Sequence, residues 1–418
     1  MARRKTRTTR QFEILLIAAA SLYVAHTLFS LLSYSTGLSY ALRFAGISKL
    51  AIPYGDLVQL TYTAGCDAPL EALSDGSQTC DPSGRPYNLM FPALLLFKTL
   101  GINSGSHPWI GLAMGIATIA TLAIFLEATK KEIRLSGRLY LFIISLSCFP
   151  MQLAVERGNT DLVIFVAISW FCLALHKFKR LSSLRSLFSC LALSVFAILF
   201  KLWAGPGMIL AFTKEIISRR KSFQSSDFRA LATATALAGT AFIISYLSSS
   251  HVFRHTEVWE GHFSFGLNAS YYAPALGEPG LYKPELRIWK IAAASTAAFI
   301  SWRQLQASSH RPAENNPSLT HTTLTVGYLV YACVYFLSNS WDYRLICLIF
   351  CLPFFFSNTY TGGTAIRMSC TILIAFTLFE LYIPVQLLAG APETFSDLIA
   401  QPVLLGILGS CVFQKTYQ

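Results

Sequence analysis

The sequence predicts an all-α polytopic integral membrane protein. Of its 418 residues, 54% are hydrophobic and only 13% are charged, whereas a soluble domain carries about 25% charged residues. Apolar runs of helical length alternate with polar turns, and at roughly 20 residues per span the chain has room for about ten to twelve transmembrane helices. Lys and Arg gather in alternate turns, as the positive-inside rule requires of a multi-pass protein.

The first elements are a basic segment, an apolar helix and a long outer loop. Residues 1–11 are rich in Arg and precede an apolar run at 12–34. This run is longer than the core of a secretory signal and lacks a small-residue cleavage site, so we expect an uncleaved helix with its basic end in the cytoplasm. An outer loop at 35–106 follows. Its stretch 88–103 is apolar but short, which leaves open whether it spans the membrane or is re-entrant.

The later apolar runs are predicted to cross the membrane in alternating directions, at 107–127, 139–155, 162–176, 230–248, 288–302, 322–338, 345–357, 366–386 and 399–414. The segments 187–201 and 204–213 are expected to form two short helices, broken near Lys201 and Gly205. Basic clusters at 130–138, 177–185, 214–221 and 303–311 fall on the cytoplasmic side, and a second outer loop covers 249–287. Residues 12–414 thus form one transmembrane domain, with 415–418 as a cytoplasmic tail.

Charge and cysteine usage exclude several classes. The net charge of +12 follows from the basic turns, so no nucleic-acid partner is expected. Eight cysteines lie in apolar runs and are interpreted as packing residues. Cys66 and Cys80 share the first outer loop, where a disulfide is allowed if that loop is extracytoplasmic. No Cys/His spacing predicts a zinc site.

Polar residues near the membrane are candidates for function because they are costly there. Asp56 is either a general base for a hydroxyl acceptor or a turn residue after Pro53 and Gly55. The dense polar run at 156–161 is either part of a site or a solvated hairpin, in which Arg157 and Asp161 would be i,i+4 ion-pair partners on a helix.

Two cations fall on the same outer side. Lys201 stands at the outer end of a helix, where it either binds a phosphate or extends to lipid headgroups. Arg344 follows aromatic residues and has the same two interpretations. Together these residues favour chemistry at a membrane surface in which cations stabilise a phosphate leaving group and a carboxylate activates a hydroxyl nucleophile.

At these positions the chain resembles a known family. The stretch Glu156-Arg157-Gly158-Asn159-Thr160-Asp161 is similar to the Glu-Arg-Gly-Asn-x-Asp signature of glycosyltransferase family 87, whose members are GT-C-type transferases. Looser similarities follow in order along residues 10–357: Gly55-Asp56 resembles the loop aspartate, Leu199-Phe200-Lys201-Leu202 a Lys-Leu-Tyr-Pro segment, and Asp342-Tyr343-Arg344-Leu345 a late Tyr-Arg-Leu segment.

The resemblance implies an inverting hexosyltransferase, most simply a mannosyltransferase, that uses a polyprenyl-phosphate sugar donor on the extracytoplasmic face. It implies Asp56 as the base and Arg157, Lys201 and Arg344 as cations for the lipid phosphate. Donor or acceptor would be oriented by Glu156, Asn159, Asp161, Asp342 and Tyr343. The expected partners are the donor, a glycolipid or cell-envelope glycan acceptor, and membrane lipids. We expect no cofactor and no metal.

Other function classes fit the same composition. A lipid-linked glycan flippase or transporter would bind its cargo at the midplane, often between internal repeats, and we see no repeat. A polysaccharide ligase would also work on the outer face, and a non-catalytic membrane scaffold is the third alternative. The expected location is a bacterial inner membrane with both termini in the cytoplasm, although the endoplasmic reticulum would keep the same topology.

Overall fold

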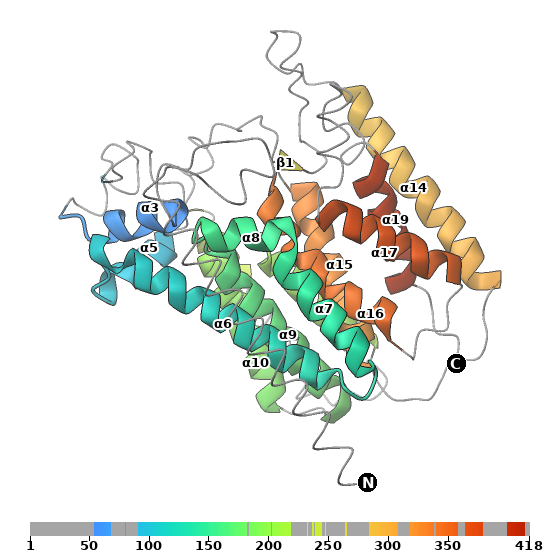
Figure 1. Cartoon of the computed structure of the whole chain (residues 1–418), viewed down its shortest axis with the longest axis horizontal. Coiled ribbons are helices and arrows are strands. Elements are labelled where there is room, and N and C mark those ends of the chain that lie inside the picture. Colours follow the sequence, from blue (N-terminus) through green and yellow to red (C-terminus); the bar gives the residue numbers. More distant parts are fainter. Residues whose placement is uncertain are drawn as a thin grey trace.

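The structure is a computed structural model that describes most of the chain. The described residues are 54–67, 80, 91–181, 184–201, 203–218, 232, 236–237, 239–244, 247, 264–265, 284–307, 318–337, 340–357, 364–378 and 399–413. They are almost entirely helical (Figure 1), so the predicted helical class is confirmed for this part of the chain. The expected helix at 12–34, both terminal segments and most of the two outer loops lie outside the described residues.

The helices follow one another closely along the chain. They are α3 (Gly55–Ala64), α5 (Phe91–Thr99), α6 (His107–Ala128), α7 (Leu135–Ser147), α8 (Phe149–Glu156), α9 (Asp161–Leu181), α10 (Leu184–Phe200), α11 (Gly205–Ser218), α14 (Pro284–Ala307), α15 (Leu319–Leu337), α16 (Leu352–Phe356), α17 (Thr364–Leu378) and α19 (Gln401–Phe413). Two 3₁₀ helices, η1 (Ser104–Ser106) and η4 (Asp342–Phe350), join them. Strands β1 (Ser264–Phe265) and β2 (Ser340–Trp341) pair antiparallel, with Ser264 opposite Trp341.

Two of the described helices are long and apolar enough to cross a membrane. They are Ser104–Ala128, with 25 residues, and Asp161–Leu181, with 21 residues. Several shorter apolar helices accompany them, among them α7, α10 and α19. The stretch at 88–103 contains only the nine-residue α5. At 1.5 Å per residue this helix is about 14 Å long, well short of a hydrocarbon core of about 30 Å.

The structure differs from the expected helices at two places. The run 139–155 is not one helix, because the backbone is extended at Cys148 and a new helix, α8, begins with Pro150 in its first turn. Proline lacks the amide hydrogen that a helix interior needs, and the first turn tolerates this loss. The run 345–357 is divided between η4 and α16, with Pro353 at the start of α16. The expected break between α10 and α11 is present.

The helices pack around one apolar core, with buried residues on nearly all of them. The closest approach is between α14 and α19, where a Cβ on Gly406 would lie 2.1 Å from the Ala294 carbonyl oxygen. Seven of the eight unpaired cysteines are buried and Cys333 is half-buried, which confirms their interpretation as packing residues.

Opposite ends of this bundle carry different polar elements. In Figure 1, α3 and α8 lie along the upper edge of the view, and the basic turn between α6 and α7 lies at the lower edge. In that lower turn, Glu132 accepts hydrogen bonds from the backbone N–H groups of Leu319 at 2.7 Å and Thr320 at 3.0 Å, and from the hydroxyls of Ser318 and Thr320, each at 2.6 Å. Glu132 therefore caps the N-terminus of α15.

Candidate functional site

The turn between α8 and α9 is built by the local sequence. Gly158 has φ +60°, the left-handed conformation that commonly ends a helix. The N–H of Asn159 donates to the Ala154 carbonyl at 2.7 Å and the N–H of Gly158 donates to the Val155 carbonyl at 3.1 Å, which is a Schellman motif. The Asn159 side chain then accepts from the N–H of Asp161 at 2.9 Å, at the start of α9. The Glu-Arg-Gly-Asn-x-Asp segment is thus one helix end, a turn and the next helix start.

Helix α3 brings Asp56 to this turn. The N–H of Asp56 donates to the Arg157 carbonyl at 3.0 Å, and the carboxylate lies in the first turn of α3, where the helix dipole favours negative charge. Tyr54, just before α3, has φ +56°, which is uncommon outside glycine. A Cβ on Gly158 would lie 2.8 Å from the Tyr54 Cβ, and a Cβ on Gly111 would lie 2.8 Å from the Tyr54 ring. Two glycines therefore make the space in which Tyr54 is held.

Both oxygens of the Asp56 carboxylate are engaged. Oδ1 accepts from Arg157 Nη2 at 2.6 Å and Arg157 Nε at 3.0 Å, and Oδ2 accepts from Asn159 Nδ2 at 2.6 Å. The ion pair is accessible, since the Asp56 side chain is 20% exposed and the Arg157 side chain 24% exposed. These contacts span more than a hundred positions of sequence, and they place a charged pair at the surface of an otherwise apolar bundle.

Behind this pair lies a buried second half of the network. Lys201 Nζ lies 3.0 Å from Asn159 Oδ1 and 3.0 Å from Asp161 Oδ1. The indole N–H of Trp203 donates to the same Asp161 oxygen at 2.9 Å. Asp161 is fully buried, and its Oδ2 has no hydrogen-bond partner among the described residues. The break between α10 and α11 is therefore tied to the start of α9.

The environment of Asp56 favours its ionised form. Burial alone would raise the pKa of Asp56, but the charge of Arg157 and the hydrogen bonds from Arg157 and Asn159 outweigh burial. The pKa of Asp56 therefore lies below its ordinary value. At neutral pH the group is a carboxylate that can accept a proton, in a field to which Lys201 also contributes.

The structure brings together five of the residues singled out in the sequence: Asp56, Arg157, Asn159, Asp161 and Lys201. The expected i,i+4 pair of Arg157 and Asp161 is wrong, because the turn at Gly158 separates them and each finds another partner. The interpretation of 156–161 as a solvated hairpin is also wrong, since Asn159, Thr160 and Asp161 are buried.

The other candidates are only partly described. Arg344 is half-buried in η4, and its positive charge acts on Lys201. Asp342 and Tyr343 begin η4 and Glu156 ends α8, while the side chains of these three lie outside the described residues. The β1–β2 pair joins the second outer loop to the segment that leads into Arg344.

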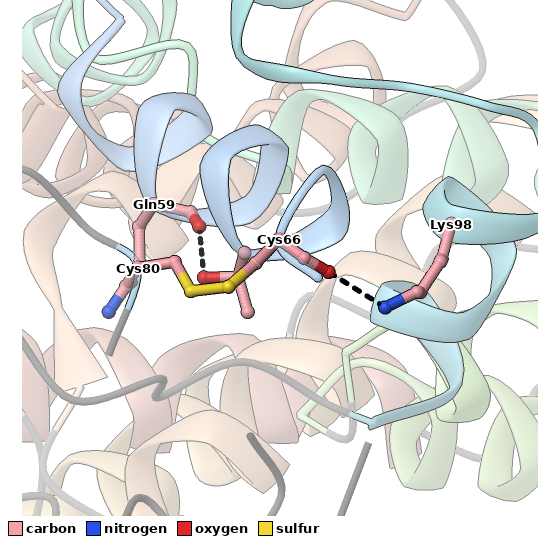
Figure 2. Close-up of a disulfide and its surroundings, with 5 residues drawn as sticks. Gln59, Cys66, Cys80 and Lys98 are labelled. Carbon is pink, nitrogen blue, oxygen red and sulfur yellow. Dashed lines mark hydrogen bonds between the residues drawn. A yellow bond between two sulfur atoms is a disulfide. The ribbon is translucent and has the colours of Figure 1, made fainter. Parts of the chain in front are cut away.

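Cys66 and Cys80 form a disulfide in the first outer loop, with their Cα atoms 6.2 Å apart (Figure 2). Cys66 follows α3 directly, and its carbonyl accepts a hydrogen bond from Lys98 of α5 at 2.9 Å. The disulfide and this bond tie the C-terminal end of α3 to its surroundings. The opposite end of the same helix carries Asp56.

Two residues of this site were missed by the sequence analysis. Trp203 carries a signal, because an indole N–H in an apolar segment usually needs an acceptor, and Asp161 is the carboxylate that it meets. Tyr54 carries none, since its left-handed backbone depends on glycines far away in the sequence. Among the described residues, no group of three or more His, Cys, Asp or Glu side chains could hold a metal ion.

Chemically, the site offers an exposed carboxylate held by an arginine, with a second cation behind it. Comparisons of the chain with protein-family models, with curated proteins and with solved structures found no match.

Proposed function

We propose that this protein is a polytopic membrane hexosyltransferase of the GT-C type, related to family 87. It transfers a hexose, most simply mannose, from a polyprenyl-phosphate donor to a hydroxyl of a glycolipid or cell-envelope glycan. The observation that carries the proposal is the network that joins Asp56 to Arg157, Asn159 and Lys201 from three separate segments. It contains the carboxylate and the cations that such a transfer needs, at positions that resemble the family's motifs.

In the proposed reaction, the acceptor oxygen attacks the anomeric carbon of the sugar while the bond from that carbon to the phosphate oxygen breaks. The lipid phosphate leaves with the electron pair, and Asp56 takes the hydroxyl proton. Attack from the face opposite the phosphate inverts the configuration. Arg157 and Arg344 stabilise the charge of the leaving phosphate. When the phosphate engages Arg157, that cation holds Asp56 less strongly, and the basicity of Asp56 rises as it is needed.

Two further observations support the extracytoplasmic placement of this chemistry. The Cys66–Cys80 disulfide lies at the end of α3, and disulfides persist in oxidising compartments such as the periplasm. The basic turn between α6 and α7 lies at the opposite end of the bundle (Figure 1), which suits the cytoplasmic side. We propose a bacterial inner membrane as the location, with the helices of this bundle as its spans.

The test is transfer by the purified protein in lipid vesicles. Radiolabelled polyprenyl-phosphate mannose or glucose is incubated with the protein and a membrane lipid extract, and labelled products are separated by chromatography. Asp56→Asn should abolish product, and Asp67→Asn should leave it unchanged, because Asp67 is exposed beyond the end of α3. Near-normal turnover in the Asp56 variant would refute its role as base. Movement of the labelled donor across the vesicle with no glycosidic product would instead identify a flippase.

A further inference from the structure

Lys201 points into the protein rather than toward the surface. Its side chain is 8% exposed, whereas that of Arg157 is 24% exposed. The ammonium lies between two oxygens, Asn159 Oδ1 and Asp161 Oδ1, each at 3.0 Å. Trp203, two residues further on, reinforces this placement through its own bond to Asp161. A cation in this position is engaged by the protein.

The donors around Asn159 fix which way its amide faces. Its Oδ1 accepts from Lys201 and from the N–H of Asp161, and its Nδ2 therefore faces Asp56 Oδ2, to which it donates at 2.6 Å. The two ends of an amide have nearly the same shape, so the hydrogen-bond partners alone distinguish them. A flipped amide would set Nδ2 against the ammonium of Lys201 and Oδ1 against the Asp56 carboxylate, and both contacts are repulsive.

We propose that Lys201 is a positioning residue, which orients Asn159 so that the Asn159 amide holds the carboxylate of Asp56. Asp161 and Trp203 in turn hold Lys201. Lys201 thus acts on Asp56 through Asn159 and is not a ligand of the donor phosphate. This inference rests on the proposed function in one respect, namely that Asp56 is the base.

The consequence for catalysis is geometric. Arg157 grips Oδ1 and Asn159 grips Oδ2, so that the two together set the plane of the Asp56 carboxylate. Without the Asn159 contact the carboxylate can rotate about its Cβ–Cγ bond, and small misplacements of a catalytic group lower the rate strongly. Loss of Lys201 should therefore lower kcat and leave the KM for the donor unchanged.

The experiment is a double-mutant cycle on the Asp56–Asn159–Lys201 chain in vesicles, with radiolabelled polyprenyl-phosphate hexose. Lys201→Met and Asn159→Ala should each lower kcat about tenfold or more, with the donor KM within about twofold. In the Asn159→Ala background, Lys201→Met should change kcat by less than about twofold, because its route to Asp56 is already cut. Lys201→Arg should restore part of kcat, since a guanidinium also donates to both oxygens.

Two outcomes overturn the proposal. The first is multiplication of the two effects in the double variant. The second is a donor KM raised about tenfold by Lys201→Met at unchanged kcat, which is the result expected of a phosphate ligand. If Lys201→Met fails to fold because it leaves Asp161 buried and unpaired, the charge-balanced variant Lys201→Met with Asp161→Asn takes its place in the cycle.

A readout that does not depend on activity separates this proposal from the proposed function. The Asp56 pKa is followed by NMR of protein labelled with ¹³C in the Asp carboxyl carbons, and the Asp56 signal is identified by its loss in Asp56→Asn. Lys201→Met and Asn159→Ala should both raise this pKa, and the double variant should raise it little beyond Asn159→Ala. An unchanged pKa in Lys201→Met refutes the positioning role even if no transferase activity exists. Turnover that persists in Asp56→Asn refutes the proposed function alone.

Discussion

Gly158 offers a sharp test of how the site is held together, because its replacement has two separate costs. Its φ of +60° is unfavourable for any residue with a Cβ, and the new Cβ would lie 2.8 Å from the Tyr54 Cβ and 3.1 Å from the Leu57 Cβ. The backbone cost is about 1–2 kcal/mol, and overpacking costs about 1–3 kcal/mol more. Gly158→Ala should therefore destabilise the protein by about 2–5 kcal/mol.

Two other glycines serve as matched controls. Gly101 has φ +68° with nothing within 4 Å of its Cβ position, so Gly101→Ala isolates the backbone cost of about 1–2 kcal/mol. Gly55 has neither the positive φ nor a close neighbour, and Gly55→Ala should be neutral or slightly stabilising. Stability is measured by thermal and denaturant unfolding in one detergent, with transfer activity measured in parallel.

The order of the three variants decides the matter. Gly158→Ala should be the least stable and should also lose activity, because Tyr54 and Leu57 flank Asp56 and any shift of α3 separates Asp56 from Arg157. If Gly158→Ala is no less stable than Gly101→Ala, the close packing of Tyr54 against the turn does not constrain α3. The account of how Asp56 is positioned would then be refuted.

Three further predictions concern the rest of the molecule. Glu132→Gln should lower the free energy of unfolding by about 1–2 kcal/mol, because it weakens the cap of α15, while transfer activity, measured at the other end of the bundle, should remain; a loss of activity at unchanged stability would contradict a purely structural role. Cys66→Ser with Cys80→Ser should cost about 3 kcal/mol, as expected for a disulfide that spans 14 positions, and treatment of the wild type with reductant should lower its melting temperature equally. The folded-state pKa of Asp56 lies below its unfolded value, so its stabilising contribution is present above about pH 4 and is lost as the pH falls through the folded pKa; Asp56→Asn should therefore flatten the stability profile below that pH, and an identical profile in the variant would refute the ion-pair assignment.

The helical class was predictable from the sequence because apolar periodicity and charge placement are local properties. Helices such as α6 and α9 were found close to their observed bounds for the same reason. The sequence missed the break at Cys148 because a proline in an apolar run is compatible with a kink or with a new helix start, and only the packing of α7 and α8 selects between them.

The candidate site divides in the same way. Its residue types, and the side of the bundle on which they fall, followed from the sequence. The partners did not, since Arg157 pairs with Asp56 and not with Asp161. That choice depends on the left-handed turn at Gly158, which directs the two side chains to different neighbours.

What the sequence by itself determined is a helical, apolar chain with its unusual charges placed between the helices, because burial of apolar surface and the cost of charge at membrane depth act on each segment separately. Only the tertiary structure decided that Asn159 stands between Asp56 and Lys201, with one end of its amide toward each. Hydrogen bonds depend on distances of a few tenths of an ångström between segments far apart in the chain, and the packing of α3, α9 and α10 sets those distances.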